Sequence, residues 1–254
     1  MEDYQLANDC NLRILTYNTG DNTGTRSNFN LLQTKLNKDL EAFNYSTHLL
    51  EQHLDYDRVM KPFYGKNYPS IILNKLKKED IDPQDARVDP NGRELKYAEA
   101  AVLFTGALAL FKLFGPRPKA NAWLAAGHAR NSHILPIFMH PDSPSYPTTR
   151  FTCARGAGSY VEAADFVIFT KRQFCTPEAQ EWLKSAGADL PKRKCDRPGC
   201  GKVESYMGEW RRCTGCFEVY YCGEDCQRRH WAGQGRDGHK APCKEAKSLR
   251  NMGF

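Results

Sequence analysis

Hydrophobic residues recur at helical spacing in much of the chain up to residue 186. The clearest early stretch follows residue 28, where apolar side chains lie three or four positions apart and therefore share one helix face. Those side chains are Phe29, Leu32, Leu36, Leu40 and Phe43. The spacing predicts one helix over 29–43, and the apolar residues between 49 and 54 continue it or begin a second. Residues 1–27 are instead rich in Asn, Thr, Asp and Gly, which is typical of a loop or a disordered segment, except that the short apolar piece Leu12–Leu15 suits a strand or a docking segment.

The most apolar helix is predicted over Glu94–Phe114. Its central run, Ala100–Phe111, holds almost no polar side chain, which favours a helix buried among other helices. This apolar run is shorter than the roughly 20 residues that a helix needs to span a bilayer, so we expect no transmembrane segment. Further helical patterns follow at Asn121–Arg130, Ile134–Met139 and Tyr160–Lys171.

A last helix before the cysteine-rich region is indicated by the residues that open it. Thr176 can cap the first turn with its hydroxyl, Pro177 suits the first helical position, and Glu178 suits the positive end of the helix dipole. The apolar positions within Ala179–Leu183 would form the buried face of this helix. Taken together, these patterns predict an all-α domain over 28–186.

The last quarter of the chain holds seven of the ten cysteines. With one histidine they form four closely spaced pairs, which are Cys195 and Cys200, Cys213 and Cys216, Cys222 and Cys226, and His239 and Cys243. The two side chains of such a pair can bind the same metal ion, and zinc takes four such ligands in a closed tetrahedral site. Eight ligands therefore predict two structural Zn²⁺ ions.

Disulfides are the alternative explanation for clustered cysteines. The N-terminal segment has neither the basic start nor the apolar run of a secretory signal. Seven cysteines are also an odd number, which disulfides would leave incompletely paired. Both features favour zinc over disulfides, and they lead us to expect an intracellular protein of the nucleus or the cytoplasm.

The order of the four pairs allows two ways of sharing two ions. Sequential sites would join the first pair to the second, whereas a cross-brace would join the first to the third and the second to the fourth. Residues 195–243 resemble the MYND-type zinc finger in ligand order, in Tyr221-Cys222, Cys226-Gln227 and Trp231, and in His239-Lys240. That resemblance implies the cross-brace. It would place Cys195, Cys200, Cys222 and Cys226 at one ion, and Cys213, Cys216, His239 and Cys243 at the other.

Two departures from the usual form of this family concern the ligands. The first pair has four intervening residues, and Pro198-Gly199 is expected to make the turn between them. The segment before His239 is longer than usual and carries three glycines, which is typical of a flexible insertion. His230 follows Cys226 by four positions and competes with His239 as a ligand. We favour His239, because its His-x3-Cys spacing matches the family.

In the MYND family, the residues that match Gln227 and Trp231 line a groove for proline-rich peptides of partner proteins. The two are four positions apart on the helix expected after Cys222, so they share one face. The resemblance thus implies a zinc-binding adaptor for protein–protein interaction. The alternative is a nucleic-acid-associated transcriptional regulator, because 14 Lys and Arg stand against 8 Asp and Glu from residue 191 onward. This excess equals the net charge of +6 of the whole chain.

We predict no enzymatic activity, since the chain contains no Gly-x-Ser-x-Gly elbow, phosphate-binding loop or His-Glu-x-x-His motif.

The predicted fold class is mostly α, with an all-α helical domain followed by a small cross-braced finger. Residues 160–183 also resemble the N-terminal region of fungal MYND-containing proteins. The expected order is a polar N-terminus (1–27), the helical domain (28–186), a basic linker (187–194), the finger (195–243) and a tail (244–254).

Overall fold

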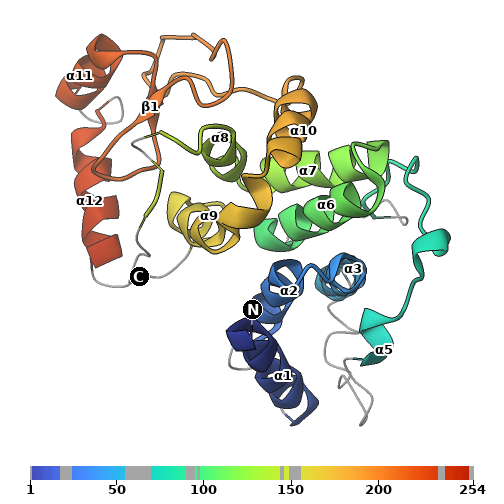
Figure 1. The fold of residues 1–254 in the computed structure, drawn as a ribbon. Helices are drawn as coiled ribbons and strands as arrows, with labels where there is room; N and C mark the ends of the chain where they lie inside the picture. Colours follow the sequence, from blue (N-terminus) through green and yellow to red (C-terminus); the bar gives the residue numbers. More distant parts are fainter. Residues whose placement is uncertain are drawn as a thin grey trace. The chain divides into compact units, whose positions relative to one another are not determined.

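The computed structural model of the chain describes residues 2–17, 25–54, 70–89, 95, 98–143, 146–148, 156–233 and 238–251. This part is mostly helical, which confirms the predicted fold class (Figure 1). Its helices are α1 (Glu2–Tyr17), α2 (Thr25–Lys35), α3 (Asp39–Leu54), α5 (Ser70–Leu73), α6 (Ala100–Phe114), α7 (Pro118–Arg130), α8 (Ile134–Met139), α9 (Tyr160–Phe174), α10 (Pro177–Gly187), α11 (Glu224–Ala232) and α12 (Lys240–Asn251), with a 3₁₀ turn, η1, at Lys78–Asp80. An antiparallel hairpin pairs β1 (Arg211–Arg212) with β2 (Tyr220–Tyr221), Arg211 opposite Tyr221.

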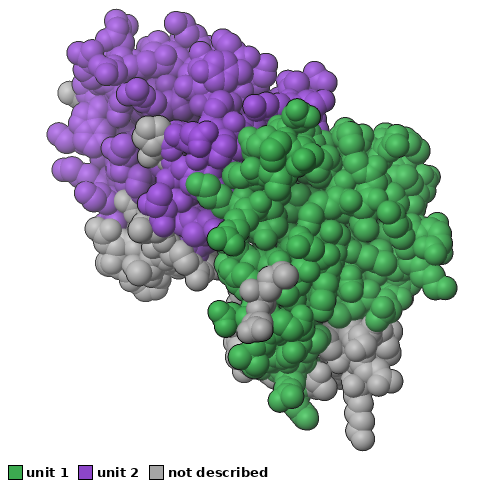
Figure 2. Space-filling model, viewed as in Figure 1, with its two compact units in different colours: residues 1–130, 169–182 green, residues 131–168, 183–254 purple. Residues whose placement is uncertain are grey.

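The chain divides into two compact units, which Figure 2 distinguishes by colour. Unit 1 comprises residues 1–130 and 169–182, and unit 2 comprises residues 131–168 and 183–254. One division follows the end of α7, and the other two fall within α9 and within α10, so α9 and α10 each contribute residues to both units. Residues 131–168 are therefore grouped with the cysteine-rich segment and not with the helices that precede them.

Helix α6 forms the centre of unit 1, as its apolar run predicts. Its side chains from Val102 to Leu110 are all buried, and the helix packs against α7 and α3. The approach to α7 is close, because a Cβ added at Gly106 would lie only 2.3 Å from the ring of Trp123. Since Trp123 is itself buried, the absence of a side chain at Gly106 allows the two helices to meet.

The start of α10 also agrees with its sequence signals. The hydroxyl oxygen of Thr176 accepts a hydrogen bond from the backbone N–H of Ala179 at 3.3 Å, so Thr176 caps the helix. Ala179, Trp182 and Leu183 are buried, as expected for the inner face. Within unit 1, the Trp182 ring stacks on Phe111 with centroids 4.5 Å apart.

The single helix predicted over 29–43 is wrong, because the chain forms α2 and α3 with a break between them. Asn37 adopts a left-handed conformation with φ of 56°. The N–H of Asn37 donates to the carbonyl of Thr34 at 3.2 Å, and the N–H of Lys38 donates to that of Gln33 at 3.0 Å. These two bonds make a Schellman motif that ends α2. The spacing of the leucines runs through the break, so hydrophobic periodicity alone cannot reveal it.

The loop or disorder predicted for residues 1–27 is wrong for residues 2–17, which form α1, and for residues 25–27, which begin α2. Asn8 and Leu15 are seven positions apart on one face of the helix, and both are buried. The Gln33 side-chain amide on α2 donates a hydrogen bond to Asn8 Oδ1. A buried pair of amides thus helps to hold α1 on α2, and a composition rich in Asn hides this contact. Residues 18–24 lie outside the described residues.

The expected tail after residue 243 continues as helix through most of its length, because α12 begins before Cys243 and ends at Asn251. The helix predicted from Glu94 begins only at Ala100, and part of the stretch before it lies outside the described residues. Of the predicted flexible insertion at 232–238, residues 234–237 also lie outside the described residues, and Ala232 ends α11. Among the helices that the structure describes, none combines the length and the apolar character needed to cross a bilayer.

Candidate metal centre

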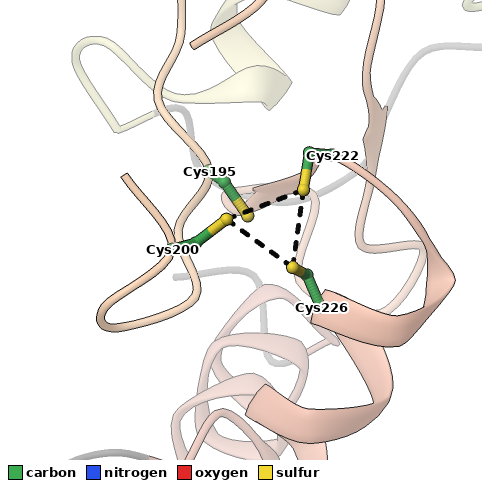
Figure 3. A group of neighbouring side chains, drawn as sticks. All are labelled: Cys195, Cys200, Cys222 and Cys226. Carbon is green, nitrogen blue, oxygen red and sulfur yellow. Dashed lines mark hydrogen bonds between the residues drawn. The ribbon is translucent and has the colours of Figure 1, made fainter. Parts of the chain in front are cut away.

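Four cysteines in unit 2 bring their sulfur atoms together from three parts of the chain (Figure 3). They are Cys195 and Cys200 before the hairpin, Cys222 directly after β2, and Cys226 in α11. The Sγ of Cys222 lies 3.4 Å from that of Cys226 and 3.7 Å from that of Cys200. Zinc with Zn–S bonds of about 2.3 Å in a tetrahedron separates its sulfur ligands by about 3.8 Å, so this spacing fits one zinc ion.

Backbone hydrogen bonds set the position of the first pair. The N–H of Cys195 donates to the carbonyl of Lys202 at 2.9 Å, which brings both ends of the intervening loop together. Gly199 adopts a positive φ of 74°, so the turn expected at Pro198-Gly199 is present. This turn accommodates the longer spacing of the first pair and leaves Cys195 and Cys200 directed at the same point.

A second group in unit 2 is made up of four buried residues. It consists of Cys213, Cys216, His239 and Cys243. Cys213 Sγ lies 3.7 Å from Cys243 Sγ, and Cys216 Sγ lies 3.4 Å from His239 Nε2. Cys213 and Cys216 lie in the connection between β1 and β2, where the N–H of Phe217 donates to the carbonyl of Cys213 at 2.9 Å. His239 and Cys243 are one helical turn apart at the start of α12.

The two groups join the first pair to the third and the second to the fourth, which confirms the cross-brace. All seven cysteines are free of disulfides. Within each group the ligand atoms lie within 4.8 Å of one another. The donor sets, four thiolates in one case and three thiolates with an imidazole in the other, fit two structural zinc ions. Four protein ligands at each ion leave no open position for a substrate.

The structure brings His239, and not His230, to the second group. His230 Nδ1 instead lies 3.0 Å from the hydroxyl of Tyr221, and the carbonyl of His230 accepts the N–H of His239 at 2.8 Å. Burial lowers the pKa of His239, and the nearby His230 lowers it further. A lowered pKa favours the neutral imidazole, which is the form that binds a metal ion.

The ionisation of the thiols is unequal in the first group. The pKa of Cys200 is lowered to about 6, chiefly because the backbone N–H of Lys202 donates to its sulfur. Burial raises the pKa of Cys222 to about 12, and the neighbouring sulfurs act in the same direction. Arg197 Nε donates to Cys226 Sγ at 3.2 Å, so this cation offsets thiolate charge. A bound divalent ion would remove the remaining thiol protons.

Sequence reasoning missed the contacts that join this region to α8 and to the first part of α9 within unit 2. His133 Nδ1 lies 2.7 Å from the hydroxyl of Tyr220, and burial raises the pKa of Tyr220 to about 12, so that hydroxyl keeps its proton. The ring centroid of the buried Tyr160 lies 5.3 Å from that of Phe217. The guanidinium carbon of Arg212 lies over the Tyr160 ring, 3.8 Å from its centroid. Isolated histidines and aromatics give no spacing signal for such long-range contacts.

The predicted basic linker takes part in the same packing. Arg193 Nη2 donates to the carbonyl of Ser132 at 2.6 Å, and its guanidinium lies 3.7 Å from the ring centroid of Tyr220. Lys194 forms an isolated antiparallel bridge with Val203. The end of the segment 187–194 is thus held in unit 2 by specific contacts.

Gln227 and Trp231 share one side of α11, as their spacing predicts. The Gln227 side chain is exposed, and Trp231 retains 39% of its surface in contact with solvent. The Trp231 ring centroid lies 6.0 Å from that of the ligand His239. One part of the indole thus covers the second metal group while another part stays open. Their role in binding a partner stays a prediction.

We expect the purified protein to carry two zinc ions per chain, and the two candidate histidines to behave differently. His239→Ala removes a ligand and should lower the content clearly below two ions per chain. His230→Ala should keep both ions, because His230 supplies no ligand atom to either group. Elemental analysis of protein purified without chelator measures both variants. Equal zinc loss in the two would contradict the assignment, as would a wild-type protein with one ion or none.

Comparison with known proteins places the same boundaries on this region. Residues 195–243 match the family model described as MYND finger. Two F-box proteins of Arabidopsis thaliana are similar over 66 residues, at 39% and 36% identity. Each match covers 25% of this chain and 18% or 16% of the plant protein, so the chain spans less than a fifth of these relatives. No solved structure matches the chain significantly.

Proposed function

We propose that this protein, whose residues 195–243 are a zinc-binding protein-interaction domain of the MYND type, is an adaptor that binds proline-rich peptides of partner proteins. The observation that carries the proposal is the pair Gln227 and Trp231 on the open side of α11. Both metal groups have four protein ligands, which suits ions that stabilise the domain. We also propose that the protein has no enzymatic role and acts inside the cell, in the nucleus or the cytoplasm.

The chemistry of the two side chains suits an extended peptide. A partly exposed indole offers a flat apolar surface on which proline rings can pack, and such aromatic anchors often supply most of the affinity of an interface. The Gln227 amide lies one turn earlier and can both donate to and accept from a peptide backbone. Because Trp231 lies against His239, metal binding would hold this surface in place.

The basic residues of this region favour the peptide over nucleic acid. Three arginines are engaged within unit 2, since Arg193 and Arg212 lie over aromatic rings and Arg197 donates to a cysteine sulfur. They offset thiolate charge or support packing, so fewer cations remain for phosphate contacts. The net charge of this region therefore overstates its capacity for nucleic acid, and a transcriptional regulator that binds nucleic acid is the second candidate.

Fluorescence anisotropy on the full-length, zinc-loaded protein can separate these candidates. The probes are labelled proline-rich peptides, the same peptides with proline replaced by alanine, and single- and double-stranded nucleic acid. We expect proline-dependent peptide binding whose affinity changes little between about 50 and 200 mM salt. Binding to nucleic acid through phosphate contacts would instead weaken steeply over roughly this range of salt concentration. Trp231→Ala should lower peptide affinity by about 2–4 kcal/mol.

Tyr206→Ala is the matched control, because Tyr206 is an exposed aromatic of the same region but lies outside α11. It should leave peptide affinity unchanged. Equal losses in the two variants would show that exposed aromatics act without specificity. Steeply salt-dependent binding to nucleic acid, with no peptide bound, would replace the adaptor with the regulator.

A further inference from the structure

A cavity of about 300 Å³ opens in unit 1, outside the metal centre. Small-molecule sites commonly occupy about 300–1,000 Å³, so this cavity lies at the lower end of that range. Residues of α1, α2, α6, α9 and α10 line it, which means that side chains far apart in sequence converge on one space. Those that matter to its chemistry are Lys35, Leu108, Phe111, Lys112, Arg172 and Gln173.

The lining is cationic, with three basic side chains and no acidic one. Lys112 Nζ lies 2.9 Å from Asp39 Oδ1 and 2.9 Å from Asn37 Oδ1, so one nearby carboxylate offsets one of the three charges. The other two, Lys35 and Arg172, come from different helices. Like charges brought to one cavity repel each other, and a bound anion relieves that repulsion.

Lys35 is held in place by aromatic rings. Its Nζ lies 4.6 Å from the ring centroid of Phe169 and 5.1 Å from that of Tyr4. Cation–π contacts of this kind orient an ammonium group without neutralising it. The charge of Lys35 is therefore fixed at the cavity and remains available to an anion.

The remaining wall includes apolar side chains. Leu108 is fully buried, and Phe111 is fixed by its stacking on Trp182.

We propose that this cavity binds a small acidic molecule, with a phosphate or carboxylate group held by Lys35 and Arg172 and an apolar body against Leu108 and Phe111. The proposal is independent of the metal centre and of peptide binding. Convergent cations fix the sign of the ligand charge, the apolar wall selects against a free inorganic ion, and the volume limits its size.

Titration of the full-length, zinc-loaded protein followed by amide NMR tests this site with phenyl phosphate and benzoate as probes. We expect saturable shifts at Lys112 and Gln173, with a dissociation constant on the order of a few millimolar for a probe of about a dozen heavy atoms. Arg172→Gln and Lys35→Gln should each weaken binding about tenfold or more. Lys184→Gln removes a cation of α10 outside the cavity and should have no effect.

Two further probes and a folding check make the test decisive. Benzyl alcohol has the apolar body without the charge, and inorganic phosphate has the charge without the body. Both should bind much more weakly than phenyl phosphate. Far-ultraviolet circular dichroism and zinc content should be unchanged in the variants, since Arg172 is exposed. The proposal is overturned if phenyl phosphate gives no saturable shifts in the cavity, if Lys184→Gln weakens binding as much as Arg172→Gln, or if benzyl alcohol or inorganic phosphate binds equally well.

Discussion

Cys222→Ala should abolish the fold of the finger, whereas Trp231→Ala should leave it folded with both zinc ions. Cys222 belongs to the group that ties the first ligand pair to the third, so its loss opens the cross-brace. Binding of structural zinc is worth about 10–16 kcal/mol in small domains, which a core of this size cannot replace. Trp231 supplies no ligand and is 39% exposed, so its truncation removes only part of a contact.

Zinc content and near-ultraviolet circular dichroism of the two variants decide this prediction. Cys226→Ala serves as the matched control, because it removes another ligand of the same group and should reproduce the loss seen with Cys222→Ala. If Trp231→Ala loses zinc as readily as Cys222→Ala, the indole is part of the structural core, and its assignment to a peptide-binding surface fails.

The metal ligands could be predicted from sequence because each pair is local. Cys213 and Cys216, for example, are close in space whatever the rest of the chain does, and only the pairing between pairs required the resemblance. The apolar run of α6 and the cap of α10 at Thr176 are local signals of the same kind. In each case a few consecutive residues determine the structure.

Other features depend on partners distant in sequence and gave no local signal. Asn8 can be buried because Gln33 donates a hydrogen bond to its side-chain oxygen. This contact helps a segment of polar composition to pack on α2 as the helix α1. Asn37 ends α2 through its own left-handed conformation, while the leucine spacing continues past it. Tyr160 and His133 lie well before the cysteines yet contact the hairpin region, and no spacing rule connects them.

Removal of zinc should loosen α8 and the first part of α9 as well as the finger, because His133 and Tyr160 contact residues next to the metal ligands. Tyr220 and Phe217 are each within two residues of a metal ligand, and they contact His133 and Tyr160. Without the ions, these aromatic residues lose their fixed positions and the buried surface of Tyr160 meets solvent. An all-α domain independent of the finger would instead retain this region unchanged.

Amide hydrogen exchange, with and without a chelator, measures the effect. Loss of a buried aromatic contact costs about 3–5 kcal/mol, so exchange protection within 134–139 and 160–168 should fall about a hundredfold or more in metal-free protein. Amides of α6 and α7 should keep theirs, because they belong to unit 1, which contains no zinc ligand. Phe217→Ala in zinc-loaded protein is the matched variant, since it removes a contact of Tyr160 and leaves all eight ligands in place. If α8 keeps its protection after chelation, the contacts between His133 and Tyr220 and between Tyr160 and Phe217 do not support the helices, and residues 131–168 fold without the metal.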